Sequence, residues 1–201
     1  MEYVAAVFAN IGPSGRRGLL RINNRPMIEY VLDSVPDDVK EILILSHPES
    51  MEDYRVMAEE YSAELEEALD ESLDMRFQLQ PVFEKAEADG VLALPCDTPF
   101  INKDVTTFLR NIITKFSAGI PRPSIDKPEF IPASYRVAPF LKAMKENPSL
   151  GINDLVKHVN NILYISAQSF KVFDERLRFL TKVQNASDAR KAGQILQALE
   201  G

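Results

Sequence analysis

The sequence has little of what marks secreted, membrane or nucleic-acid-binding proteins. Its 201 residues contain one cysteine, Cys96, which excludes an internal disulfide framework and fits the reducing cytoplasm. No stretch approaches the roughly 20 apolar residues of a membrane helix, and no basic segment followed by an apolar one marks a signal peptide. The formal net charge of -7 argues against a chain that coats nucleic acid. We therefore expect a cytoplasmic protein with no membrane and no nucleic acid among its partners.

Metal-binding and nucleophilic side chains are also scarce. The only histidines, His47 and His158, are far apart in the sequence and have no zinc-site spacing. The acidic run over residues 49–74 is typical of a solvated helical face, which we favour over a metal cluster. Cys96 is interpreted as a small buried hydrophobic residue rather than a nucleophile. Any chemistry must therefore come from another part of the chain.

Short apolar runs alternate along the chain with longer amphipathic segments. Strands are predicted over residues 3–10, 41–47, 90–101 and 162–167, and helices over 25–35, 50–60, 103–116, 139–147, 151–161 and 186–200. A short edge strand followed by a helix is expected between residues 62 and 89. The proline-rich residues 120–137 are expected to begin as a loop and to end near a strand. This alternation predicts an α/β fold with a mostly parallel sheet wrapped by helices.

The length and the even composition predict one domain over residues 1–201. No internal repeat, low-complexity tract or long linker divides it.

A glycine-rich loop follows the first predicted strand. Gly12, Gly15 and Gly18 permit a tight backbone with free amides, and Arg16 and Arg17 add positive charge. The first strand-to-helix loop of such folds is the usual phosphate contact. The loop matches neither a Walker motif nor a dinucleotide fingerprint, so a plain surface loop is the alternative.

The stretch "LALPCDTPFI" places an aspartate directly after a buried strand. Asp97 should emerge at the carboxyl end of that strand, beside the glycine-rich loop, and Pro95 and Pro99 restrict the backbone around it. A carboxylate there suits Mg²⁺, which takes one or two carboxylates together with substrate phosphates and water. The alternative is a turn or N-cap aspartate before the next helix.

Two blocks together resemble the nucleotidyltransferases similar to molybdenum cofactor guanylyltransferase. Residues 19–22 (LLRI) followed by residues 25–28 (RPMI) match that family's second conserved block, and residues 97–100 (DTPF) match its D-x-P-[FL] motif. The resemblance implies a three-layer Rossmann-like sandwich of the nucleotide-diphospho-sugar transferase type. It also implies a nucleotide-binding half over residues 1–100 and an acceptor-binding half over residues 101–201.

The resemblance carries roles to individual residues. The catalytic residues would be Arg17 and Asp97, with Asp97 as the Mg²⁺ ligand and Gln184 as a second candidate ligand. The nucleotide, GTP or another nucleoside triphosphate, would be bound by Ala9, Asn10, Gly12, Ser14, Gly15, Arg16, Arg17 and His47. The transfer would move GMP to a phosphorylated small molecule.

The acceptor implied by the resemblance is molybdopterin. Residues 123–133 also resemble archaeal cobinamide-phosphate guanylyltransferases, so that acceptor is the alternative. Arg136 would contact the acceptor phosphate, although a surface arginine is an equal reading. Asn10 and Ile11 replace two family glycines, and Lys182 replaces an asparagine. These departures keep open a non-catalytic relative that binds a nucleotide or a partner protein.

Overall fold

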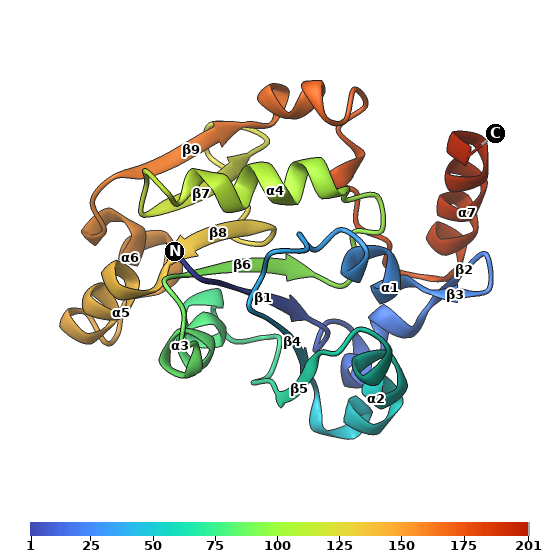
Figure 1. Ribbon diagram of the computed structural model, residues 1–201, viewed down its shortest axis with the longest axis horizontal. Coiled ribbons are helices and arrows are strands. Elements are labelled where there is room, and N and C mark those ends of the chain that lie inside the picture. Colours follow the sequence, from blue (N-terminus) through green and yellow to red (C-terminus); the bar gives the residue numbers. More distant parts are fainter. Residues whose placement is uncertain (201) are drawn as a thin grey trace.

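The computed structural model describes residues 1–200, and its central feature is a seven-stranded sheet in the order β5-β4-β1-β6-β8-β7-β9 (Figure 1). The strands are β1 (Tyr3–Phe8), β4 (Glu41–Ser46), β5 (Glu64–Glu67), β6 (Gly90–Pro95), β7 (Ala118–Arg122), β8 (Ala133–Arg136) and β9 (Ile162–Ser166). All neighbours pair in parallel except β8, which is antiparallel to both β6 and β7. Six strands therefore end at one edge of the sheet, and β8 alone begins there.

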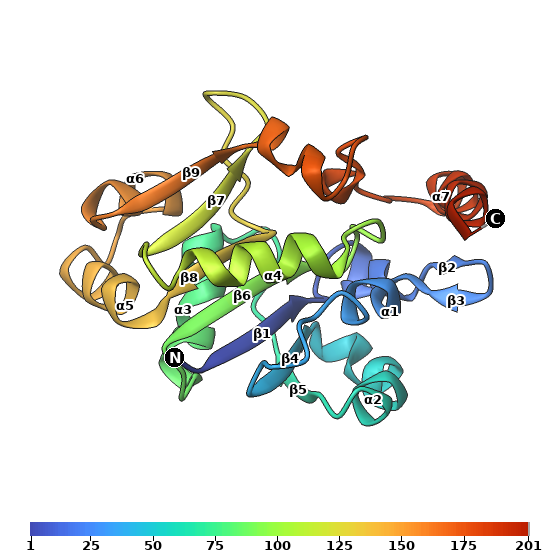
Figure 2. The ribbon, with the colours of Figure 1, turned by 45° about the horizontal axis from the view of Figure 1, so that its top comes forward.

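Helices cover both faces of the sheet, as Figure 2 shows from a second direction. One apolar cluster joins the sheet to α3, α5 and α6, and a second joins the opposite face to α1, α2 and α4. The helices are α1 (Met27–Leu32), α2 (Met51–Glu60), α3 (Met75–Lys85), α4 (Lys103–Ile112), α5 (Val137–Glu146), α6 (Ile152–Leu155) and α7 (Ala186–Glu200). The three-layer α/β sandwich with a mostly parallel sheet, predicted from the sequence, is thereby confirmed.

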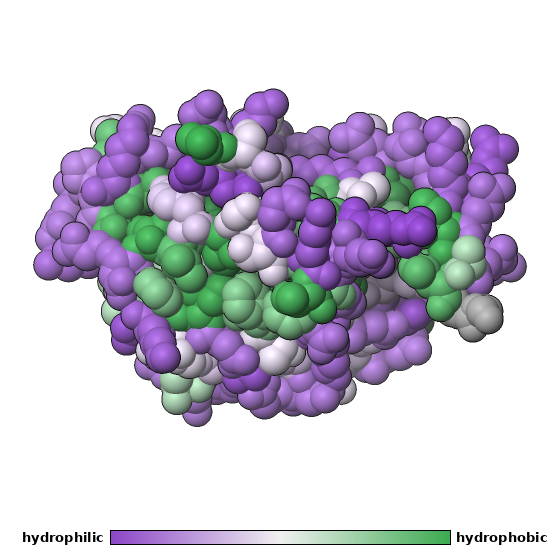
Figure 3. All heavy atoms as spheres, turned by 90° about the horizontal axis from the view of Figure 1, so that it is seen from above, coloured by the Kyte–Doolittle hydropathy of each residue, from purple (hydrophilic) through white to green (hydrophobic). Residues whose placement is uncertain are grey.

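The last helix packs apart from the two main layers. A third, small cluster joins α7 to the short hairpin β2 (Arg21–Ile22) and β3 (Arg25–Pro26), through buried Ile22, Met27 and Ala189 among others. Seen from above, the mostly hydrophilic surface is interrupted by hydrophobic areas, one of them near the C-terminal end (Figure 3), where Leu199 is exposed. Among the helices of residues 1–200, none combines the length and the hydropathy needed to cross a membrane.

The segment expected as a proline-rich loop begins instead as strand β7. Pro121 is part of this strand although it has no backbone N–H. The strand tolerates it because the ladder with β8 stops at Gly119, so that the strand pairs only with β9 over its last three residues. The carbonyl of Pro121 is satisfied by the amide of Glu129 at 2.8 Å. The proline content therefore concealed a strand that ends at the same edge as β6.

Candidate active site

The loop after β1 is tightly wound and depends on its glycines. Gly12 and Gly15 have φ angles of 82° and 65°, and Ser14 between them also has a positive φ of 51°. A Cβ at Gly12 would lie 2.9 Å from the Cβ of Arg17, so a side chain there would displace the arginine. The hydroxyl of Tyr54 on α2 donates to the Gly15 carbonyl at 2.8 Å. The loop is thus held in one conformation from both sides.

Asp97 emerges from the carboxyl end of β6 beside this loop. Its side chain is 3% exposed, and its carbonyl accepts a 2.8 Å hydrogen bond from the amide of Val183. Nη1 of Arg17 lies 3.5 Å from Oδ2 of Asp97. The structure therefore brings together the two residues that the sequence singled out for catalysis.

Burial and the neighbouring cations have opposite effects on the pKa of Asp97. Burial raises the pKa of Asp97 above its usual value, and the cations of Lys182 and Arg17 pull that pKa partly back down. Within residues 1–200, Oδ1 of Asp97 and Nε of Arg17 are buried without a hydrogen-bond partner. A buried, unpartnered carboxylate oxygen is unfavourable unless a ligand satisfies it. The two unpartnered atoms therefore indicate a place where a ligand could bind.

A magnesium ion fits this donor set with help from substrate. The free oxygen of Asp97 is a hard anionic donor of the type that Mg²⁺ takes. The described residues contain no group of three or more carboxylate, histidine or cysteine side chains placed to hold a metal. Phosphate oxygens and water would have to complete the coordination. Gln184, the second candidate, is exposed, and its backbone amide donates to Asp188 at 3.1 Å.

The other residues predicted to bind the nucleotide differ in where their side chains lie. Arg16 points away to α2, where its Nη1 pairs with Asp53 at 2.7 Å. His47 follows β4 and lies against the loop, because a Cβ on Gly15 would approach the Cβ of His47 to 2.6 Å. The carbonyl of Ala9 accepts from the hydroxyl of Tyr54 at 3.4 Å. Ser14 is exposed at the tip of the loop.

Asn10 is buried within a small polar cluster between the loop and α3. Its amide nitrogen donates to the Leu69 carbonyl at 2.7 Å and to Oε1 of Gln78 at 3.0 Å, while its Oδ1 has no partner among the described residues. Next to it, the backbone amide of Gly12 donates to the carboxylate of Glu71 at 2.7 Å. An amide that the sequence predicted to face a nucleotide is therefore taken by the chain's own carboxylate.

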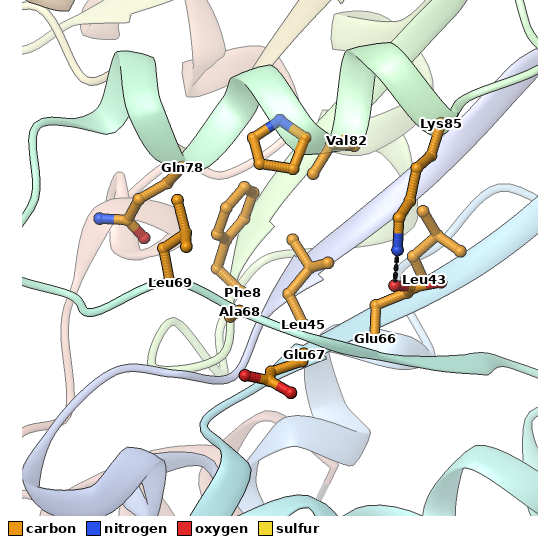
Figure 4. Close-up of a pocket in the computed structure, with 11 residues that line it drawn as sticks. Phe8, Leu43, Leu45, Glu66, Glu67, Ala68, Leu69, Gln78, Val82 and Lys85 are labelled. Atoms are coloured by element: carbon orange, nitrogen blue, oxygen red, sulfur yellow. Dashed lines mark hydrogen bonds and ion pairs between the residues drawn. The ribbon is translucent and has the colours of Figure 1, made fainter.

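A small cavity under this cluster does not belong to the site. It has a volume of about 30 Å³ and lies between α3 and the β1, β4 and β5 strands (Figure 4). Phe8, Leu45 and Val82 line it, and the Lys85–Glu66 ion pair lies beside it. A space of this size has room for one or two water molecules. It is a packing gap and not a nucleotide pocket.

Arg136 lies at the opposite edge of the sheet from Asp97. Because β8 is antiparallel to β6, Arg136 pairs with Gly90, the first residue of β6, whereas Asp97 follows the last residue of that strand. This places the two residues about 20 Å apart along the strand direction. Arg136, predicted to contact the acceptor phosphate, therefore lies far from Asp97. The sequence pattern gives no direction for β8, and the reversed strand carries the arginine away.

Other residues near Asp97 were missed or misjudged in the sequence. Lys182 was interpreted as an unfavourable replacement, but its cation, like that of Arg17, lowers the pKa of Asp97, and its Nζ lies 3.6 Å from Glu129. Arg122 ends β7 at the same sheet edge as Asp97. The only sequence signal for Arg122 was its position in a run of prolines. Glu71 belongs to the acidic run over residues 49–74, so nothing in the sequence distinguished it from its acidic neighbours.

Comparison with known proteins identifies the family to which this chain belongs. The family model described as "MobA-like NTP transferase domain" matches residues 12–162. A curated protein, molybdenum cofactor guanylyltransferase from Shewanella putrefaciens, is 27% identical over 101 residues, which are 48% of each chain. The chain thus matches about half the length of that curated relative. The resemblance identified in the sequence is confirmed at the level of the family.

Solved structures share the fold over nearly the whole chain. Molybdopterin-guanine dinucleotide biosynthesis protein A from Archaeoglobus fulgidus has a TM-score of 0.72 at 18% identity, covering 97% of this chain and 99% of that one. 4-Diphosphocytidyl-2C-methyl-D-erythritol synthase from Anaerococcus prevotii has a TM-score of 0.73 at 14% identity, covering 98% and 99%. At these identities the likeness concerns the fold alone, and it extends to proteins named for different nucleotides.

Proposed function

This chain belongs to the family of MobA-like NTP transferase domains, and we propose that it transfers a nucleoside monophosphate, GMP first among them, from a triphosphate to a phosphorylated small molecule. The observation that carries the proposal is the 3.5 Å pair of Arg17 and Asp97 between the glycine-rich loop and the end of β6. Molybdopterin is the leading acceptor because a curated relative bears the name molybdenum cofactor guanylyltransferase. Cobinamide phosphate is the second.

In the proposed reaction an oxygen of the acceptor phosphate attacks the α-phosphorus. A new phosphorus–oxygen bond forms there, the bond to the bridging oxygen of the β-phosphate breaks, and pyrophosphate leaves. Such transfers depend on positioning and on neutralising charge. Mg²⁺, held by Oδ1 of Asp97 and by phosphate oxygens, would offset charge on the leaving group.

Two cations of the chain would neutralise the remaining phosphate charge. Arg17 is half-buried beside Asp97, so its fork can hold β- or γ-phosphate oxygens without leaving the aspartate. Lys182 precedes Val183 in the segment that is hydrogen-bonded to Asp97, and its charge acts on Asp97. It would stabilise negative charge on the α-phosphate during transfer. The Val183–Asp97 backbone hydrogen bond fixes the distance between that segment and β6. Both cations therefore lie where charge builds up during transfer.

A turnover assay tests the proposal. Protein is incubated with GTP or CTP, Mg²⁺ and each acceptor, and pyrophosphate release is measured. Asp97→Ala should lower the rate by about a hundredfold or more, as expected for loss of a transition-state charge contact. Asp104→Ala, an exposed aspartate in the first turn of α4, is the matched control and should leave the rate unchanged. A rate unaffected by Asp97→Ala would rule the mechanism out.

One observation favours a second candidate, a relative that binds a nucleotide without transferring it. The carboxylate of Glu71 occupies the Gly12 amide, which in an active loop would face the nucleotide. Saturable nucleotide binding, with no pyrophosphate from any nucleotide and acceptor pair, would support this candidate over the enzyme.

A further inference from the structure

The carboxyl end of β7 carries a cation that the proposed mechanism does not use. Arg122 is the last residue of β7, and its guanidinium carbon lies 5.2 Å from the ring centroid of Tyr164 on β9. A guanidinium is attracted to an aromatic face at this distance. Tyr164 is 38% exposed, so the pair lies at the surface of the sheet edge. Stacking on a ring leaves the hydrogen-bonding fork of an arginine available.

Arg122 has no anionic partner among the described residues. Five of the twelve arginines, namely Arg16, Arg17, Arg25, Arg55 and Arg110, pair with carboxylates, and Arg122 is one of the seven that do not. It is distinguished by its stacking on Tyr164 at the carboxyl end of β7. In a chain with a formal net charge of -7, carboxylates are plentiful. An arginine that is fixed in position and left without a carboxylate in such a chain is suited to an external anion.

The strand register places this arginine near the reacting centre. Gly119 of β7 and Leu92 of β6 both pair with Ser134 of β8, so they lie at the same level of the sheet. Arg122 follows three residues beyond Gly119, and Asp97 follows five beyond Leu92. Two strand spacings and two residues of rise separate their Cα atoms by about 12 Å. An extended small molecule can reach both.

Charged residues of alternating sign lie between Asp97 and Arg122. Lys182 acts on Asp97 and pairs with Glu129 at 3.6 Å. The amide of Glu129 in turn donates to Pro121, the residue before Arg122. The signs alternate from Asp97 through Lys182 and Glu129 to Arg122, and only the last of them lacks an opposite partner among the described residues.

We infer that Arg122, held on Tyr164, binds a second anionic group of the acceptor, distant from the phosphate that reacts at Asp97. The inference rests on the proposed function for the reacting end. It narrows the acceptor to small molecules that carry an anionic group in addition to the phosphate that reacts. It also replaces Arg136 by Arg122 as the acceptor-binding arginine.

Binding of inorganic phosphate tests the subsite without any turnover. The full chain, labelled with ¹⁵N and saturated with a non-hydrolysable GTP analogue and Mg²⁺, is titrated with inorganic phosphate while the arginine Nε–H signals are followed. The signal of Arg122, which is assigned by its absence in Arg122→Lys, should shift saturably. The shift should weaken in Tyr164→Leu and persist in Tyr164→Phe, which keeps the ring. A signal of Arg122 that does not move overturns the inference.

Arg136 is the matched control in this titration. It is also a half-buried strand-end arginine with no ion pair within residues 1–200, but it lies at the opposite edge of the sheet. Its signal should stay in place. Equal shifts at Arg122 and Arg136 would mean general attraction of anions to arginines, and would also overturn the inference.

Kinetics supply the second arm, with GTP as donor and molybdopterin as acceptor. Arg122→Gln should raise the KM for the acceptor about tenfold or more, with the KM for GTP changed less than about twofold, and Arg136→Gln should change neither. An active variant with an unchanged acceptor KM contradicts the subsite. If the unmodified chain shows no transfer at all, the proposed function fails, and the phosphate titration still decides the subsite separately.

Discussion

In the glycine-rich loop after β1, several polar groups have partners within the chain, whereas at the ends of β6 and β7 two cations are exposed or unpaired among the described residues. The Gly12 amide is bonded to Glu71, and Arg16 is paired with Asp53. By contrast, Arg122 rests on an aromatic ring with its fork free, and Lys182 is exposed with one long ion pair. Under the proposed function, a nucleotide would have to displace contacts inside the protein in order to bind, whereas an acceptor would meet groups that are already available.

The largest expected effect is on the transfer rate, and it should differ between the neighbouring arginines Arg17 and Arg16. Arg17→Ala should lower the transfer rate by about 10²–10³-fold, because it removes a charge contact of the transition state. Arg16→Ala should change the rate less than about threefold, since Arg16 faces α2. Steady-state pyrophosphate release measures both variants. Equal losses would mean that the pairing with Asp53 breaks when nucleotide binds, and that the loop rearranges.

The second effect concerns the cation that approaches Asp97 from the acceptor half. The charge of Lys182 lowers the pKa of Asp97, which burial has raised. Lys182→Gln removes that charge, so the pKa rises further and a smaller fraction of Asp97 is ionised at a given acidic pH. The acid limb of the kcat/KM profile should therefore move to higher pH. A limb that stays in place, at any level of activity, would show that another group controls it.

A smaller effect would test whether the loop is blocked by its own carboxylate. Glu71→Gln should tighten nucleotide binding by about three- to tenfold, because a negative charge is removed from the place where phosphates or a base must enter. Glu67→Gln, at an exposed glutamate that ends β5, is the control and should have no effect. Isothermal titration with GTP and Mg²⁺ measures both. Weaker binding in Glu71→Gln would instead make Glu71 a direct contact of the nucleotide.

The smallest effect is on stability. The folded state raises the pKa of Asp97, so ionisation favours unfolding, and the stability present below the unfolded pKa of about 3.9 is lost as pH rises through the higher folded value. Asp97→Asn removes this loss at neutral pH. A gain on the order of 1 kcal/mol would raise Tm by about 2–4 °C at pH 7 without Mg²⁺. The gain should shrink toward pH 4. A lower Tm at pH 7 would show that the pair with Arg17 outweighs burial.

The sequence alone was sufficient for the layered fold and for the pair at the centre of the site. Strand and helix periods, and an aspartate that directly follows a buried run, are local features. Parallel strands bring their carboxyl ends to one edge, so Arg17 and Asp97 were expected together before any coordinates. The division at residue 100 into two functional halves remains a prediction, because a single sheet takes strands from both sides of it.

Only the tertiary structure decided which side chains surround that pair. The direction of β8 depends on long-range strand pairing, and its reversal sends Arg136 to the far edge and leaves Arg122 near Asp97. Glu71 accepts a hydrogen bond from Gly12, and the charge of Lys182 acts on Asp97, across wide separations in the sequence. Local periodicity has no information about such contacts, since they arise when packing of the whole sheet fixes where distant segments lie.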